Sequence, residues 1–100
     1  MLEVEHADPD LARLETGVDY PVGFSVPVVK QFRILMQLIR TASGKNALYQ
    51  HGGRRLEKLG GKRQHQHSMR LNKKYRLIAE FFGEVPNEKI LIVGIENHYE

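Results

Sequence analysis

A run of apolar residues at helical spacing is the feature of this sequence that most constrains its fold. Between Val28 and Ile39 the large apolar side chains recur every three or four positions, so they share one face of a helix. Pro27 suits the first turn of that helix, and Gly44 is its expected end. The spacing predicts a helix of about 16 residues with one buried face.

The residues before this helix predict a short strand and then a short helix. Leu2–Glu5 alternates apolar and polar side chains, as a strand with one buried face does. Asp8 can cap the free N–H groups of a helix that starts at Pro9. Gly17 is the expected end of that helix.

The second half of the chain predicts a sheet, because its apolar runs are short and are separated by Gly, Asn and Pro. Residues 72–74 form a tight connection between two strands of a hairpin. Residues 89–95 are apolar at both parities, which predicts an interior strand covered on both sides. The expected strands are 54–59, 67–71, 75–82 and 89–95.

These elements predict an α+β fold in which an N-terminal strand and two helices pack on an antiparallel sheet of about four to five strands. A chain of 100 residues, 41% of them hydrophobic, can bury one modest core, so we expect a single domain over residues 1–100. Alternate residues of a strand share a face. Arg70 and Arg76 are therefore expected near one another on the face away from the helices.

The composition excludes several kinds of chemistry. The sequence has no cysteine, which removes disulfides, thiolate metal sites and cysteine nucleophiles and favours a reducing compartment. Neither a secretory signal nor a membrane-spanning run is visible, so we expect a cytoplasmic protein. His65 and His67 have a spacing that could bind a metal on one side of a strand, but without nearby partners we expect neither a metal nor a cofactor.

The distribution of charge indicates a polyanion as a partner. Residues 1–25 hold six acidic residues against one arginine, whereas residues 54–76 hold nine basic residues against one glutamate. Each phosphate that a basic surface neutralises releases condensed counterions, so such a surface binds nucleic acid with salt-sensitive affinity. A solvated basic face without a ligand is the alternative that composition leaves open.

Two segments resemble the HigB-type toxins of the RelE/ParE superfamily: RRLEKLGGKRQHQHSMRLNKKYRLI at residues 54–78 and IVGIENHY at residues 92–99. Residues 1–45 agree with that family mainly in their order of strand and helices. The resemblance implies the fold outlined above and a toxin of a bacterial type II toxin–antitoxin module. HigB and RelE types cut mRNA on the ribosome, and ParE types poison DNA gyrase.

A nuclease of this kind needs cations for the charge that gathers at the phosphate, and a group that moves protons. No metal is required if a ribose 2′-hydroxyl attacks its own phosphodiester. Arg76 and Arg70 are the candidate catalytic residues that bind the phosphate, because a guanidinium offers it a planar fork. The resemblance supports Arg76, which matches the arginine of the family's N-D-Q-W-R motif.

The resemblance implies that His98 and Tyr99 are the catalytic residues that move protons. Many relatives end in D-Y-H where this chain has Asn97-His98-Tyr99, so the order of the rings is exchanged and the carboxylate is absent. Gly60 stands where relatives use a lysine at the active site, and Lys62 lies two positions away.

Other side chains of the second half are expected to contact RNA. For Tyr75 two alternatives stay open, stacking on a base or packing against the helices, and its parity with Leu77 favours packing. The expected RNA-binding residues are Lys58, Lys62, Arg63, His67, Lys73 and Lys74.

The resemblance therefore predicts a ribosome-dependent mRNA endonuclease that arrests translation and growth. Its expected partners are the ribosome, mRNA and a cognate antitoxin, which we expect to be a helix-turn-helix protein of the HigA type, and no membrane is expected. Two alternatives are a toxin-fold protein with weakened cleavage that mainly binds its antitoxin and represses their shared promoter, and a ParE-type gyrase inhibitor.

Overall fold

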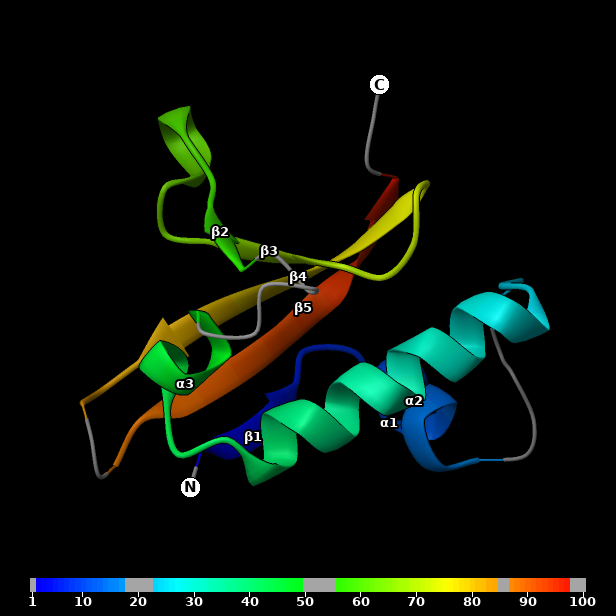
Figure 1. Cartoon of the computed structure of the whole chain (residues 1–100), viewed down its shortest axis with the longest axis horizontal. Helices are drawn as coiled ribbons and strands as arrows, with labels where there is room; N and C mark the ends of the chain where they lie inside the picture. The colour runs from blue at the N-terminus through cyan, green and yellow to red at the C-terminus, as the bar shows by residue number, and fades with distance from the viewer. Residues whose placement is uncertain (1, 18–22, 50–55, 85–86, 98–100) are drawn as a thin grey trace.

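The computed structural model describes residues 2–17, 23–49, 56–84 and 87–97. These residues form five strands: β1 (Glu3–His6), β2 (Glu57–Lys58), β3 (His67–Arg70), β4 (Tyr75–Phe82) and β5 (Lys89–Asn97). The strands make one mixed sheet in the order β1-β5-β4-β3-β2 (Figure 1). Only the pairing of β1 with β5 is parallel. The predicted α+β fold is confirmed, with a parallel strand at one edge.

The first helix, α1 (Pro9–Thr16), begins as its sequence predicts. The Asp8 carboxylate accepts a hydrogen bond of 2.9 Å from the backbone N–H of Asp10, which satisfies one free donor of the first turn. At the other end, the backbone N–H of Gly17 donates to the carbonyl oxygen of Arg13 at 2.5 Å. Both predicted ends of α1 are therefore confirmed.

The second helix, α2 (Val26–Thr41), has the predicted 16 residues. It ends before Gly44, since the backbone N–H of Ala42 closes the last turn on Ile39. A third helix that the sequence analysis missed, α3 (Lys45–Tyr49), follows. The carboxylate of Glu88 accepts a 2.8 Å hydrogen bond from the backbone N–H of Lys45 at the start of α3. Because Glu88 lies 43 positions from Lys45 in the sequence, no local pattern predicts the start of α3.

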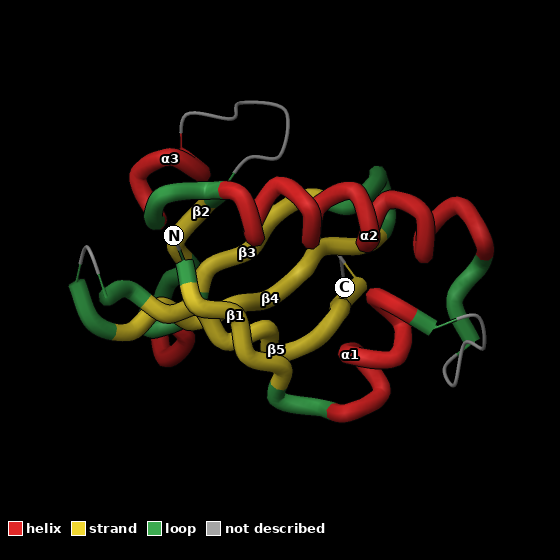
Figure 2. Tube along the Cα trace, turned by 90° about the horizontal axis from the view of Figure 1, so that it is seen from below, coloured by secondary structure: helices red, strands yellow, loops and turns green. Residues whose placement is uncertain are grey.

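The main core lies between the helices and one face of the sheet. Figure 2 shows α2 running across the strands, and its Phe32, Leu35, Met36 and Ile39 are completely buried. Against them pack fully buried strand residues, among them Leu77, Ile90 and Ile92. Each such side chain stabilises the fold by about 1.5–3 kcal/mol relative to an exposed position.

The β3–β4 hairpin has the predicted tight connection. The side-chain oxygen of Asn72 accepts hydrogen bonds from the backbone N–H groups of Lys74 at 2.8 Å and Tyr75 at 2.7 Å. A polar side chain that bonds to the backbone two or three residues on is typical of such turns. β4 has the predicted bounds, and β3 ends one residue earlier than predicted.

Two predictions about the strands need correction. The predicted strand 54–59 is reduced to the two residues of β2, with residues 54 and 55 outside the described part. A short 3-10 helix, η1 (Gly61–Arg63), follows β2. β5 is an interior strand, as predicted, but it is not covered on both sides. Ile90 and Ile92 are fully buried toward the helices, whereas Leu91 on the opposite face is only half-buried. The helices cover one face alone.

None of the helices in the described ranges is long and apolar enough to span a bilayer.

Candidate functional site

We call the sheet face away from α1 and α2 the open face, and the arginine site is its group of Arg63, Arg70, Arg76 and Glu96. The antiparallel register places Arg70 of β3 directly opposite Arg76 of β4, and Arg76 opposite Glu96 of β5. Directly opposed residues of neighbouring strands have side chains within contact reach. The predicted proximity of Arg70 and Arg76 is therefore confirmed.

Glu96 joins two arginines of the site. Its carboxylate oxygens accept hydrogen bonds from both terminal nitrogens of Arg63, at 3.0 and 2.7 Å. One of the same oxygens lies 3.7 Å from a terminal nitrogen of Arg76. The hydrogen bonds with Glu96 raise the pKa of the Arg63 guanidinium above its usual value. Arg63 is thus held over the sheet by a fork of two bonds, the geometry in which arginine also binds phosphate.

Arg76 has the most enclosed charge of the site. Its side chain is 19% exposed, and its Nε is buried without a hydrogen-bond partner among the described residues. A buried donor without a partner is costly, and native structures seldom leave one. An anion that enters the site could accept this bond.

The segment that carries η1 is tied onto the open face. The Gln66 side chain donates to the carboxylate of Glu80 at 3.0 Å and accepts from Nε of Arg63 at 3.0 Å. The imidazole of His65 lies 3.7 Å from the same Glu80 carboxylate. Figures 1 and 2 show η1 on the other side of the sheet from α2. Arg63 therefore approaches the arginine site from η1 rather than from a strand.

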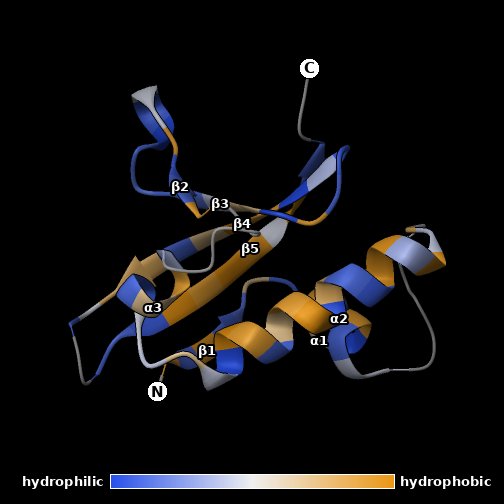
Figure 3. Cartoon of the chain, in the orientation of Figure 1, coloured by the Kyte–Doolittle hydropathy of each residue, from blue (hydrophilic) through white to orange (hydrophobic). Residues whose placement is uncertain are grey.

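Three of the lysines predicted to bind RNA lie in exposed segments beside the arginine site. Lys73 and Lys74 lie in the turn between Arg70 and Arg76, and Lys62 lies on η1. Lys58 is exposed on β2, at the sheet edge. Figure 3 shows hydrophilic colour on η1 and on the β3–β4 turn, in contrast to the apolar centre of β5. Lys62, Lys73 and Lys74 thus flank the arginine site in sequence and structure, whereas Lys58 pairs with His67 and lies on the helix-covered side.

His67, which was also predicted to bind RNA, lies on the helix-covered face of the sheet and not near the arginine site. It is 7% exposed, its Nε2 lies 3.1 Å from the hydroxyl of Tyr49, and its ring packs edge-on against Phe81 at 5.1 Å between centroids. Burial, followed by the nearby charges of Lys45 and Lys58, lowers the pKa of the His67 imidazole.

This burial contradicts the prediction that His67 contacts RNA, because the residue shares the helix-covered face with Met69. The pairing of His65 with His67 on one side of a strand is also wrong, since His65 lies in the turn before β3. In the described part of the chain, no group of three or more His, Asp or Glu residues could hold a metal ion.

Of the two alternatives for Tyr75, the structure shows packing within the protein, the one that its parity with Leu77 favours. Its half-buried ring meets the ring of Phe24 edge-on, with centroids 5.5 Å apart, and it adjoins the main core. The Nζ of Lys74 lies 5.5 Å from the centre of the Tyr75 ring. The predicted proton-transfer residues His98 and Tyr99 lie outside the described residues, beyond the last residue of β5.

Three polar residues that organise the site were not predicted from the sequence: Glu96, Gln66 and Glu80. The signal for Glu96 was weak but present, because extending the predicted β5 by two residues places it beside Arg76. Nothing in the sequence signals the bonds of Gln66, since they depend on how the η1 segment folds over the sheet.

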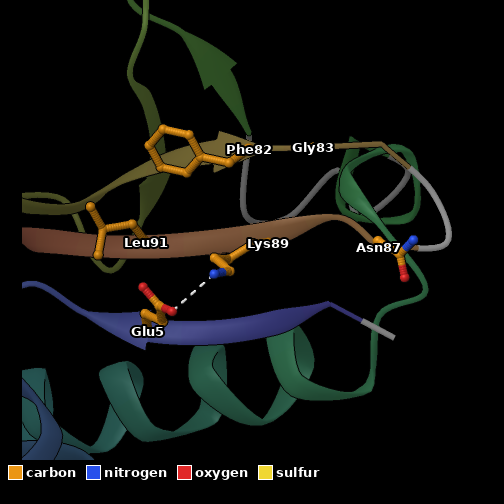
Figure 4. Close-up of a pocket in the computed structure, with 6 residues that line it drawn as sticks. All are labelled: Glu5, Phe82, Gly83, Asn87, Lys89 and Leu91. Carbon is orange, nitrogen blue, oxygen red and sulfur yellow. Dashed lines mark ion pairs between the residues drawn. The ribbon is translucent and has the colours of Figure 1, made fainter.

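A hollow lies on the open face, far along β4 and β5 from the arginine site. Figure 4 shows its lining residues: Glu5, Phe82, Gly83, Asn87, Lys89 and Leu91. Lys89 and Glu5 form an ion pair of 3.1 Å across β5 and β1, and Phe82 is 48% exposed. The hollow is open and mainly apolar, and it contains no concentration of cations.

Comparisons with known proteins agree with this architecture. The structure is similar to "YoeB/ParE toxin from Agrobacterium tumefaciens", with a TM-score of 0.61 and 16% sequence identity, over 98% of this chain and 100% of that chain. At this identity the likeness supports the fold alone. No curated protein matches the sequence. The family model described as "RelE-like toxin of type II toxin-antitoxin system HigB" matches residues 23–98, and the chain therefore belongs to this family of toxins.

Proposed function

We propose that this toxin arrests translation by cutting mRNA on the ribosome, with the arginine site as the place where the scissile phosphate binds. One observation carries the proposal: Arg70 and Arg76 stand opposite one another on the open face, and Nε of Arg76 is buried with no partner in the described ranges. Two arginines on directly opposed strand positions provide the positive charge that a phosphodiester needs as it reacts.

The proposed reaction is internal transesterification. The ribose 2′-oxygen forms a bond to the adjacent phosphorus while the bond from phosphorus to the 5′-oxygen breaks, which leaves a 2′,3′-cyclic phosphate and a free 5′-hydroxyl. Negative charge grows on the non-bridging oxygens, where Arg76 and Arg70 stabilise it. We assign the transfer of protons from the 2′-oxygen and to the 5′-oxygen to His98 and Tyr99, on the sequence alone.

The exposed cations around the site would hold the RNA backbone. We assign this role to Lys62, Arg63, Lys73 and Lys74, which lie beside the open face. Lys58 is left out because it pairs with His67 in the register and therefore lies on the helix-covered side of the sheet edge. Contacts of this kind position RNA without reading its sequence, and each gives the affinity a salt dependence. His67 is left out of this set because it is buried.

Membership of a type II family implies an antitoxin as partner. We propose that this antitoxin is a helix-turn-helix protein of the HigA type that acts with the toxin in the cytoplasm. The strongly basic surface around the arginine site favours an acidic contact segment, since complementary charge speeds association.

A weakened nuclease that acts mainly through its antitoxin is the second candidate, and a specific contact favours it. Glu96 already occupies Arg63 and lies near Arg76, so part of the positive charge is neutralised within the protein. Gly60, which has no side chain, also stands where the resemblance leads one to expect a catalytic lysine.

The proposal is tested on purified ribosomes programmed with a defined mRNA. Primer extension should detect new 5′ ends within the translated frame when wild-type toxin is added, and none with Arg76→Ala. If the mRNA stays intact with the wild-type toxin as well as with Arg76→Ala, and the toxin binds the protein encoded by the neighbouring gene, the second candidate is favoured. Inhibition of supercoiling by purified gyrase would instead favour a ParE-type activity.

A further inference from the structure

The carboxylate of Glu96 is bound in the way that a phosphate group would be bound. Its two oxygens accept the two terminal N–H groups of Arg63, and one of them also faces Arg76. Arginine uses the same fork for carboxylates and phosphates. An RNA phosphate that reached Arg63 and Arg76 together would therefore need the space and the hydrogen bonds that Glu96 now has.

We propose that Glu96 is an internal competitor for the RNA phosphate, which must displace its carboxylate from Arg63 and Arg76 before the arginine site can bind RNA. The proposal deepens the proposed function, on which it rests, by naming what controls the affinity of the site. Glu96 is a positioning residue in this account, since it acts through the arginines.

The contacts of Glu96 are of a kind that a phosphate can replace. The side chains of Glu96 and Arg63 are each 40% exposed, and ion pairs in contact with water are weak. The 3.7 Å separation between Glu96 and Arg76 is longer than a hydrogen bond. A phosphate, with more acceptor oxygens than a carboxylate, could satisfy Arg63 and also the unpartnered Nε of Arg76.

Gln66 provides a reason why Arg63 would stay in place when Glu96 leaves. The Nε of Arg63 donates to Gln66, and Gln66 in turn donates to Glu80 on β4. This chain of hydrogen bonds does not include Glu96. The guanidinium would therefore remain above the sheet, with its terminal nitrogens available to RNA.

Glu5 offers a matched control. It is a glutamate on the open face of β1, and it forms an ion pair with Lys89, far from the arginine site. Glu96→Gln and Glu5→Gln remove the same charge from the same sheet face, so a general effect of net charge should be equal in both. An effect through the arginine site should appear in Glu96→Gln alone.

The experiment measures binding of a 2′-O-methyl oligoribonucleotide, which cannot be cleaved, by fluorescence anisotropy with the full chain. We expect Glu96→Gln to bind about tenfold more tightly than wild type, and Glu5→Gln about twofold, in line with the contribution of single charge contacts. We also expect a steeper dependence of affinity on salt for Glu96→Gln. Equal affinities for the two variants, or no gain for Glu96→Gln, would overturn the proposal.

A measurement on the wild-type protein removes any dependence on how the variants fold. The side-chain carboxyl carbon of Glu96 should change its NMR chemical shift as the oligoribonucleotide is added, and that of Glu5 should not. Binding that leaves the Glu96 signal in place would refute the displacement. Because neither measurement involves cleavage, a toxin that binds RNA as expected but cuts no mRNA would disprove the proposed function and leave this inference standing.

Discussion

The two faces of the sheet differ in what their side chains do. On the face covered by α1 and α2, Leu77 and Ile92 are completely buried against α2, as is Phe32 of that helix, and this packing determines stability. On the open face, charged side chains are paired across strands, and one buried nitrogen of Arg76 has no partner among the described residues. The contrast suggests a division of roles in which one face holds the fold together and the other is arranged to bind an anion.

The largest expected effect is on the helix-covered face. Phe32→Ala should lower the free energy of unfolding by about 3–5 kcal/mol, because it removes a large side chain from a close-packed core. The matched change Ile34→Ala, on the same helix at a side chain 42% exposed, should cost about 0.5 kcal/mol or less. Urea unfolding monitored by circular dichroism measures both. Similar losses would mean that α2 is not packed as described.

Arg76→Ala should show the opposite pattern. We expect cleavage to fall by about 100-fold or more, as when one charge-stabilising donor is removed, so that induced expression no longer stops growth. Stability should change by about 1 kcal/mol at most, since the change removes a buried donor with no partner. Arg76→Lys should remain defective, because an ammonium group lacks the planar fork. Growth arrest by Arg76→Ala would remove this residue from the site.

His67 should make stability depend on pH without affecting the open face. Burial lowers the pKa of its imidazole in the folded protein, so the unfolded chain binds the proton more readily. Stability should therefore fall as the pH drops below the unfolded value of about 6.5 toward the lower folded value. His67→Gln should flatten this dependence in urea unfolding curves between pH 7.5 and 5, chosen as a span of roughly two units around that value. An unchanged curve would show that another group titrates.

The smallest effects should distinguish the two faces by function alone. Asp8→Ala and Asn72→Ala each remove a side chain that bonds to free backbone N–H groups, and each should cost about 1 kcal/mol. Asp8 caps α1, whereas Asn72 shapes the turn between Arg70 and Arg76. Only Asn72→Ala should also reduce cleavage, in the primer-extension assay. A loss of cleavage in both variants would mean that stability limits activity.

Much of the fold could be predicted because its signals are local. The apolar spacing of α2, the Asp8 cap and the bounds of β4 all follow from residues that are neighbours in sequence. The short helix α3 could not be predicted, because its start is capped by Glu88 from a distant part of the chain. The open side of β5 was mistaken for a covered one, since apolar residues at both parities do not reveal how many layers a fold has.

The site was predictable to the extent that alternation along strands determines it. Parity placed Arg70 and Arg76 together, and the structure agrees. The same parity places His67 with Met69 on the buried face, so this error could have been avoided from the sequence. The part played by Glu96 could not be predicted, because it requires both the β4–β5 register and the position of Arg63 on η1.

A map of RNA 5′ ends in cells tests the central claim most directly. After brief induction of the wild-type toxin, we expect new 5′ ends within translated frames. The ends should be absent after induction of Arg76→Ala at equal protein level, and present after induction of the buried-face variant His67→Gln. The same new ends with Arg76→Ala, or none with the wild-type toxin while growth stops, would contradict an arginine site that cleaves mRNA.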